Sequence, residues 1–183
     1  REDSAAWRTG LRGLELRVLP GNLWGPANNV KNVLVRPAPS PDDGPVEISV
    51  AIENSPTHQY EQANLAWYYD DSHMVKLGLE LVDRQVCIVM GREQADRTRT
   101  LAKIPVAATS VWVRLQVEGR QILGQYRVAG SNAWSEAGRG DLPVPAGGPM
   151  TPTGWMACSA PLARIAAASR QVKVVDLAMR CRM

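Results

Sequence analysis

The sequence of 183 residues predicts an all-β protein, built as a two-sheet antiparallel β-sandwich. Many short segments alternate apolar with polar residues, which is the period of a half-buried strand. Turn-forming residues separate these segments, and no long stretch has the period of an amphipathic helix. The chain contains 15 Gly and 13 Pro, and 45% of its residues are hydrophobic. This length suits one domain, which we expect to span residues 1–183.

Residues 60–91 contain three strand-length apolar segments divided by two polar turns, and they predict a β-meander. A four-residue loop at residues 70–73 would place Tyr69 opposite Met74. The same register would set Tyr68, Ala66, Asn64 and Gln62 against Val75, Leu77, Leu79 and Leu81. A two-residue loop at residues 83–84 would place Leu81, Leu79 and Leu77 opposite Val86, Ile88 and Met90. One face of the meander is then apolar, and the other carries Trp67, Lys76, Gly78, Glu80 and Cys87.

Before the meander, residues 1–13 are predicted to be a lead-in that docks through Trp7 and Leu11. Strands are expected at residues 14–18, 32–36 and 46–53, and the last of these alternates most regularly. Residues 37–45 are rich in Pro and Asp and predict a surface loop. After the meander, the basic residues 92–103 predict an exposed strand or arm ended by Pro105, with its charges discouraging aggregation.

Residues 111–128 predict a second hairpin, with Gly119 at the first position of a type II′ turn. This register pairs Val111, Val113, Leu115 and Val117 with Val128, Tyr126, Gly124 and Ile122. Its outer face carries Trp112, Arg114, Gln116, Gln125 and Arg127. Residues 129–153 are rich in Gly and Pro and contain Trp134. Strands at 154–159 and 171–179, with one or two helical turns at 161–168, complete the chain.

The charge and cysteine content narrow the classes of function. The net charge of +3 is spread along the chain, which argues against a nucleic-acid partner. No apolar segment approaches the roughly 20 residues that cross a bilayer. The chain starts at Arg1, and a secreted or periplasmic location is expected if a leader preceded that residue. Cys87, Cys158 and Cys181 are expected to be buried or half-buried thiols, and a Cys158–Cys181 disulfide between the last two strands is the alternative.

Several motifs resemble one protein family in their order and spacing across about residues 12–180. The first are Glu61-Gln62-Ala63-Asn64-Leu65, Tyr69-Asp70-Asp71 and Val75-Lys76-Leu77-Gly78-Leu79-Glu80. The next are Val111-Trp112-Val113-Arg114-Leu115, Glu118-Gly119, Gln125-Tyr126 and Trp134. The last are the segment from Gly154 to Pro161 and Val172-Lys173-Val174-Val175-Asp176. Together they resemble concanavalin A-like (laminin-G-like) jelly-roll domains, of the uncharacterised branch found as the C-terminal domain of β-xylosidases.

The resemblance implies a non-catalytic module that binds a carbohydrate or assists a neighbouring glycoside hydrolase domain. Catalytic relatives of this fold carry carboxylates in the pattern E-x-D-x-x-E, which holds two carboxyl groups about 5–5.5 Å apart. That pattern is absent, because Glu47 and Glu53 lie about 20 Å apart along a strand and Glu80 and Asp83 straddle a turn. A glycosidase is therefore the less favoured alternative.

The candidate ligand-binding residues are the aromatic and polar side chains expected on the outer faces of the meander and the second hairpin. Aromatic rings cover sugar rings, while fixed polar groups bind their hydroxyls. The candidates are Trp67, Lys76, Glu80, Trp112, Arg114 and Gln125. A protein-interaction or structural module, whose polar face has no sugar ligand, is the alternative. Asp42-Asp43 and Asp70-Asp71 are candidate Ca²⁺ ligands, and no other cofactor is expected.

Overall fold

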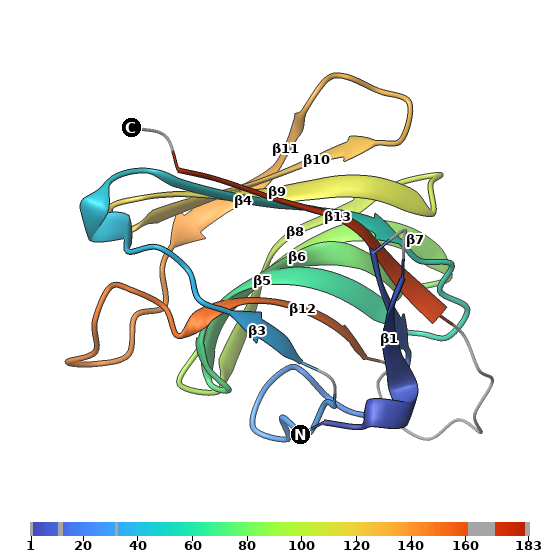
Figure 1. The fold of residues 1–183 in the computed structure, drawn as a ribbon, viewed down its shortest axis with the longest axis horizontal. Helices are drawn as coiled ribbons and strands as arrows, with labels where there is room; N and C mark the ends of the chain where they lie inside the picture. The colour runs from blue at the N-terminus through green and yellow to red at the C-terminus, as the bar shows by residue number, and fades with distance from the viewer. Residues whose placement is uncertain (1, 11–12, 32, 161–170, 182–183) are drawn as a thin grey trace.

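A computed structural model describes residues 2–10, 13–31, 33–160 and 171–181, with the backbone alone for residues 155–160 and 171–181. Two antiparallel sheets stack face to face (Figure 1). The seven-stranded sheet contains, in spatial order, β1 (Trp7–Gly10), β2 (Gly13–Arg17), β13 (Gln171–Cys181), β4 (Val46–Glu53), β9 (Ser110–Glu118), β10 (Gln121–Val128) and β11 (Ser135–Asp141). The six-stranded sheet contains β3 (Leu34–Arg36), β12 (Gly154–Ala160), β5 (Gln62–Asp70), β6 (His73–Val82), β7 (Gln85–Gln94) and β8 (Arg97–Pro105).

The hydrophobic core lies between the sheets and is made by alternate residues of the central strands. Along β4 the residues alternate between buried and half-buried positions, as their sequence predicts. The core residues of the two sheets include Ile48, Val50, Val113 and Leu115 on one side and Leu77, Leu79, Ile88 and Met90 on the other. Complete burial of such a side chain contributes about 1.5–3 kcal/mol. The predicted β-sandwich is therefore confirmed.

Two hairpins have the register expected from the sequence. In the first, Val82 pairs with Gln85, and Asp83 and Arg84 both have positive φ angles (53° and 64°), as a type I′ turn requires. In the second, Gln121 pairs with Glu118. Gly119 has a φ of 55°. A positive φ at the first turn position alone is the pattern of a type II′ turn.

The predicted register between β5 and β6 is wrong by one residue. The turn contains only residues 71 and 72, and a β-bulge leaves Tyr69 without a partner between Tyr68 and Asp70. Asp70 closes the turn by accepting a hydrogen bond from the Ser72 N–H, at 2.8 Å. Trp67 therefore pairs with Val75 and lies in the core with 0% exposure. A one-residue slip moves every side chain of a strand to the other face.

Other strands appear where the sequence predicted none. Residues 1–13 contain β1 as well as the three-residue 3₁₀-helix η1 (Ser4–Ala6), although Trp7 packs on the core as expected. The loop at 37–45 contains a second 3₁₀-helix, η2 (Pro41–Asp43). The Gly/Pro-rich stretch contains β11, and a turn at Ala95-Asp96 divides the basic segment into the end of β7 and β8. None of the helices in the described residues is long enough to cross a membrane.

Some predictions fall outside the described residues. These are the docking of Leu11, the helical turns at 161–168 and the state of the Cys158 and Cys181 side chains. Cys87 is described, and it is a buried free thiol whose pKa is raised by its removal from water.

Candidate functional site: a pocket on the six-stranded sheet

The six candidate residues do not form one site, because the structure places them in the core and on two different outer faces. Trp67 is enclosed between the sheets. Lys76 and Glu80 lie on the outer face of the six-stranded sheet, within β6. Trp112, Arg114 and Gln125 lie on the outer face of the seven-stranded sheet, in β9 and β10. The two outer faces are on opposite sides of the sandwich (Figure 1).

A pocket of about 350 Å³, here called the meander pocket, opens on the outer face of the six-stranded sheet. Its walls come from the meander, from β8 and from the loop between β2 and β3. The lining residues are Trp24, Tyr60, Gln62, Lys76, Glu80, Val82, Val89, Thr100 and Lys103. The pocket therefore combines two aromatic rings, the Lys76–Glu80 pair, a second lysine, one amide and one hydroxyl with two valines.

The floor of the meander pocket is a hydrogen-bonded polar network. Lys76 Nζ lies 3.2 Å from Glu80 Oε2, and their side chains are only 4% and 8% exposed. Lys76 Nζ also donates to Gln62 Oε1. Lys76 and Glu80 share one face of β6 with Gly78 between them, so no side chain separates them. A buried ion pair of this kind is costly to desolvate and lasts only with good partners.

Asn64 on β5 supports this network, and Gly78 lets β6 approach β5 closely beside it. The Asn64 amide nitrogen donates to Gln62 Oε1 at 2.9 Å, so Gln62 accepts from both neighbours. The Asn64 Oδ1 atom is buried and has no hydrogen-bond partner among the described residues. Buried acceptors are usually satisfied by a protein group or by water. Gly78 is required here, because a Cβ would lie 1.9 Å from the Ala63 carbonyl oxygen.

Trp24 reaches the meander pocket from the loop that joins β2 and β3. Its ring packs on Gly91, where a Cβ would come within 2.5 Å of the ring atom Cη2. The ring centre lies 4.6 Å from Lys76 Nζ, a cation–π distance. The next residue, Gly25, donates its N–H to Glu93 Oε1 at 3.0 Å. Trp24 is thus held over the polar floor by contacts with two strands.

Tyr60 also lines the meander pocket, and the turn before β5 holds it there. It is 39% exposed and has a φ of 64°, an uncommon conformation for a tyrosine. The buried Glu61 carboxylate accepts hydrogen bonds from the N–H groups of Thr57 (2.9 Å) and His58 (3.2 Å). The Tyr60 N–H donates to the Leu81 carbonyl at 2.7 Å. Glu61 therefore has a structural role in presenting Tyr60.

Sequence reasoning identifies Lys76 and Glu80 but not the other residues of the meander pocket, among them Gln62, Trp24 and Tyr60. Gln62 was assigned to the core face by the wrong β5 register. Trp24 comes from a segment far away in the sequence, and the Trp24-Gly25-Pro26 turn signal was its only indication. Nothing in the sequence indicates the positive φ of Tyr60.

Glu93, which anchors Gly25, is completely buried, and burial is the main cause that raises its pKa. A carboxyl group whose pKa is raised by folding stabilises the protein at low pH, and this contribution is lost as the pH rises through the folded-state pKa. Glu93→Gln keeps an acceptor for Gly25 without a charge. We expect the variant to gain unfolding free energy relative to wild type between pH 4 and pH 8, measured by urea denaturation.

Glu136→Gln provides the control, because the bond from Arg139 lowers the pKa of Glu136. Between pH 4 and pH 8, wild type should therefore gain unfolding free energy relative to Glu136→Gln. The difference in unfolding free energy between Glu93→Gln and wild type should change between pH 4 and pH 8. A constant difference would contradict a raised pKa for the buried Glu93 carboxyl group.

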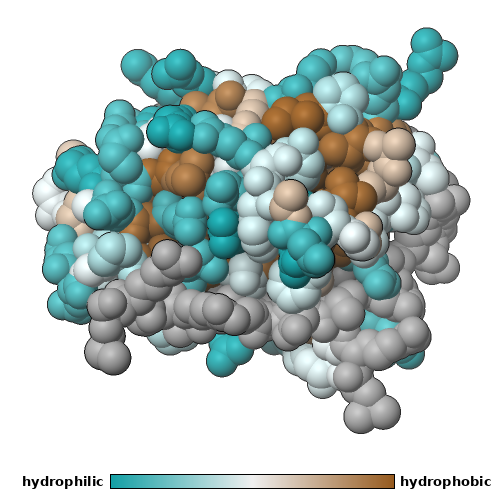
Figure 2. Space-filling view, turned by 90° about the horizontal axis from the view of Figure 1, so that it is seen from above, coloured by the Kyte–Doolittle hydropathy of each residue, from teal (hydrophilic) through white to brown (hydrophobic). Residues whose placement is uncertain are grey.

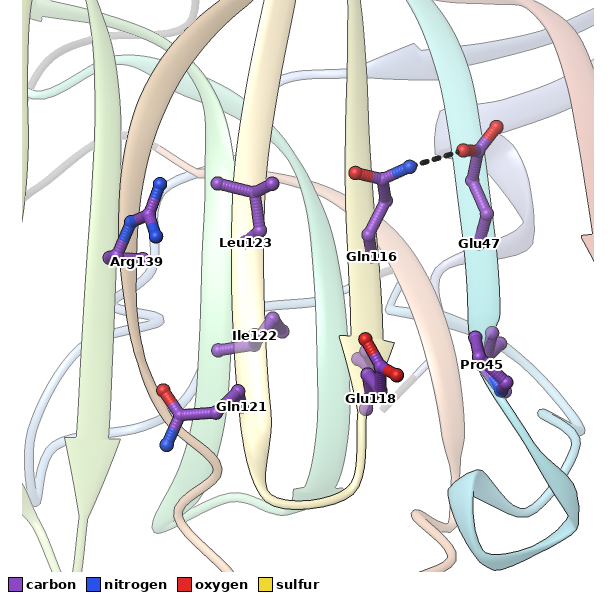
Figure 3. A pocket seen from close by; sticks show the side chains of 10 residues that line it. Pro45, Glu47, Gln116, Glu118, Gln121, Ile122, Leu123 and Arg139 are labelled. Atoms are coloured by element: carbon purple, nitrogen blue, oxygen red, sulfur yellow. Dashed lines mark hydrogen bonds between the residues drawn. The ribbon is translucent and has the colours of Figure 1, made fainter.

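The outer face of the seven-stranded sheet holds a second polar surface. Figure 2 views the molecule from this side and shows small hydrophobic groups separated by hydrophilic residues. A pocket of about 400 Å³ lies where β9 and β10 meet their hairpin turn (Figure 3). Gln116 donates to Glu47 Oε2 across this pocket at 2.7 Å. Arg114 also binds Glu47 (3.3 Å) and donates to Gln125 (2.8 Å).

Two of the predicted Ca²⁺ ligands, Asp70 and Asp71, have protein partners in the structure. Asp70 contacts His73 at 2.8 Å, and Asp71 accepts a hydrogen bond from the Tyr68 hydroxyl. Asp42 and Asp43 lie in η2. The described part of the chain contains no group of three or more His, Cys, Asp or Glu residues that could hold a metal ion. A Ca²⁺ site stays an untested prediction.

Comparisons with solved structures show the same fold in parts of larger enzymes. The GH43 protein BlXynB from Bacillus licheniformis matches 98% of this chain, with a TM-score of 0.80 and 18% identity. A xylan β-1,4-xylosidase from Bacillus halodurans matches 97%, with a TM-score of 0.76 and 15% identity. In each case the chain spans only 35% of the enzyme.

A smaller protein and a family model complete the comparison. The carbohydrate-binding module CBM66 from Bacillus subtilis matches 96% of this chain and 91% of its own length, with a TM-score of 0.54 and 8% identity. No curated protein matches the sequence. The model of a family described as "Protein of unknown function (DUF1349)" matches residues 29–175. The protein therefore belongs to the DUF1349 family, and its fold is a concanavalin A-like jelly roll.

Proposed function

We propose that the protein is a non-catalytic carbohydrate-binding module and that the meander pocket receives its glycan. The observation that carries this proposal is the buried network of Gln62, Lys76 and Glu80 in a pocket that Trp24 and Tyr60 also line. Sugar rings have apolar faces and hydroxyl-bearing edges. A site for them needs aromatic surface together with a few fixed polar groups.

The polar groups of the meander pocket suit hydroxyl ligands because they offer both donors and acceptors. Glu80 supplies carboxylate oxygens, Lys76 supplies ammonium protons and Gln62 supplies an amide. Their mutual hydrogen bonds hold them in place before a ligand arrives. A preformed site loses less conformational entropy on binding.

The same residues favour binding over hydrolysis. Retaining and inverting glycosidases both need two carboxyl groups that flank the scissile bond. Among the described residues that line the meander pocket, Glu80 is the only carboxylate, and it is paired with Lys76. The likeness to segments of GH43 proteins and to a carbohydrate-binding module supports an accessory role beside a glycoside hydrolase domain.

Tyr60→Ala tests this proposal, because the ring is exposed and its removal leaves the core intact. We expect wild type to bind at least one member of a panel that includes xylo-oligosaccharides, and the variant to bind it at least tenfold more weakly. Tenfold corresponds to about 1.4 kcal/mol, the size of an aromatic contact. Isothermal titration calorimetry measures both affinities.

Val35→Ala is the matched control, since Val35 is exposed to a similar extent (42%) and does not line the meander pocket. This variant should bind like wild type. If wild type binds no glycan in the panel, or if Tyr60→Ala binds as tightly as wild type, the proposal fails. The outer face would then be that of an interaction or structural module.

A further inference from the structure

Arg127 on β10 lies within cation–π distance of two indole rings on the outer face of the seven-stranded sheet. Its guanidinium carbon is 5.1 Å from the centre of the Trp112 ring and 5.2 Å from that of Trp134. Arg114 lies 4.2 Å from the Trp134 ring on the same face. Stacking of this kind fixes the plane of a guanidinium group and orients its N–H edge.

Arg127 differs from Arg114 in having no acceptor among the described residues. Arg114 is satisfied by Glu47 and Gln125. The Nε atom of Arg127 is buried without a hydrogen-bond partner, and no carboxylate of the described residues forms an ion pair with this side chain. A half-buried cation that is held rigidly but lacks an anion is a ready site for one. A carboxylate matches its planar fork of donors.

The rest of this face shows what kind of molecule would carry the carboxylate. Trp112, Arg114 and Gln116 on β9, together with Arg127 on β10, form a strip of side chains on this outer face. From Trp112 to Gln116 the strip runs about 13 Å along β9, toward the pocket of Figure 3. That end displays hydroxyl-binding groups, namely Glu47, Gln116, Glu118 and Gln121. Arg139 also lines that end but is paired with Glu136, and Glu47 is paired with Arg114. The Glu118 carboxylate has no ion pair among the described residues, so it would repel a partner that is acidic along its length, such as an acidic peptide. A ligand with one acidic unit beside neutral hydroxyl-bearing units fits both ends.

We propose that this strip is a second glycan site, in which Arg127 binds the carboxylate of a uronic acid unit and the pocket of Figure 3 receives a neighbouring sugar. The site is on the opposite sheet from the meander pocket and is independent of it.

The test compares acidic trisaccharides of galacturonate, glucuronate and mannuronate with their carboxyl-reduced neutral counterparts, by calorimetry at low salt. Wild type should bind at least one acidic trisaccharide tenfold or more tightly than its neutral counterpart. Arg127→Gln should abolish this preference. Arg127→Lys should retain only part of it, because an ammonium group cannot form the bidentate contact. Melting temperatures verify that the variants are folded.

Arg97→Gln, an exposed position on the other sheet, removes the same charge and should leave the preference unchanged. Tyr60→Ala should also leave it unchanged, which separates this site from the meander pocket. The proposal is overturned if wild type has no preference for any acidic trisaccharide or if Arg127→Gln retains it. Equally tight binding of a hexaglutamate peptide would also overturn it in favour of a protein partner.

Discussion

Replacing Trp67 by alanine is expected to lower the free energy of unfolding by about 3–5 kcal/mol, the usual cost of truncating a buried tryptophan. Trp67 is 0% exposed and packs in the core between the sheets. Its indole N–H lies 3.4 Å from the Tyr69 hydroxyl, which in turn donates to the Met150 carbonyl at 2.9 Å. The substitution would therefore open a cavity and disturb a buried hydrogen bond. Urea denaturation monitored by circular dichroism measures the loss.

Trp112→Ala is the matched control, since Trp112 is half-buried on the outer face and contacts Arg127. The Trp112→Ala variant should lose less than about 1.5 kcal/mol of unfolding free energy, because the substitution forms no closed cavity. If Trp67→Ala costs no more unfolding free energy than Trp112→Ala, Trp67 is not in the core. The β5 register predicted from the sequence would then be correct.

Replacing Glu80 by leucine should also cost about 3–5 kcal/mol of unfolding free energy, because it leaves the Lys76 ammonium buried without its carboxylate. Lys76→Met removes the charge that Glu80→Leu leaves unpaired. The double variant Lys76→Met/Glu80→Leu should therefore lose much less than the sum of the two single variants. Chemical denaturation of the four proteins gives the coupling energy. Additive losses would mean that the two side chains do not interact as the structure shows.

The double variant also separates stability from binding. It is expected to be folded, since a buried ion pair can be replaced by apolar residues at little cost. It should nevertheless bind glycan poorly, because two of the three polar groups on the floor of the meander pocket are gone. A folded double variant with the affinity of wild type would show that these groups do not contact the ligand.

The parts of the fold that followed from the sequence are those where a short turn determines the pairing. The loops at Asp83-Arg84 and Gly119-Arg120 have two residues each, so turn chemistry and alternation agree on one register. The β5–β6 pair failed because a bulge at Tyr69 inserts one residue, and no local signal distinguishes this bulge from a longer loop. β1 and β11 were missed because neither has a regular apolar alternation.

The candidate site was predictable only in part, for a similar reason. Lys76 and Glu80 share a strand face whatever the register of β5, so alternation was enough to bring them together. Trp24 joins them through packing on Gly91, a contact between residues 67 positions apart in the sequence. Such contacts depend on the path of a loop, which periodicity does not specify. The same limit explains why two opposite faces were taken for one surface.

If a glycan occupies the meander pocket, it lies on the polar floor beside Trp24. Heteronuclear NMR of ¹⁵N-labelled protein can detect this position, because every tryptophan has one indole N–H signal. During titration with a neutral oligosaccharide that binds, we expect the Trp24 signal to shift, while those of Trp67, Trp112 and Trp134 stay in place. A titration that moves Trp112 and Trp134 but leaves Trp24 unchanged would contradict it.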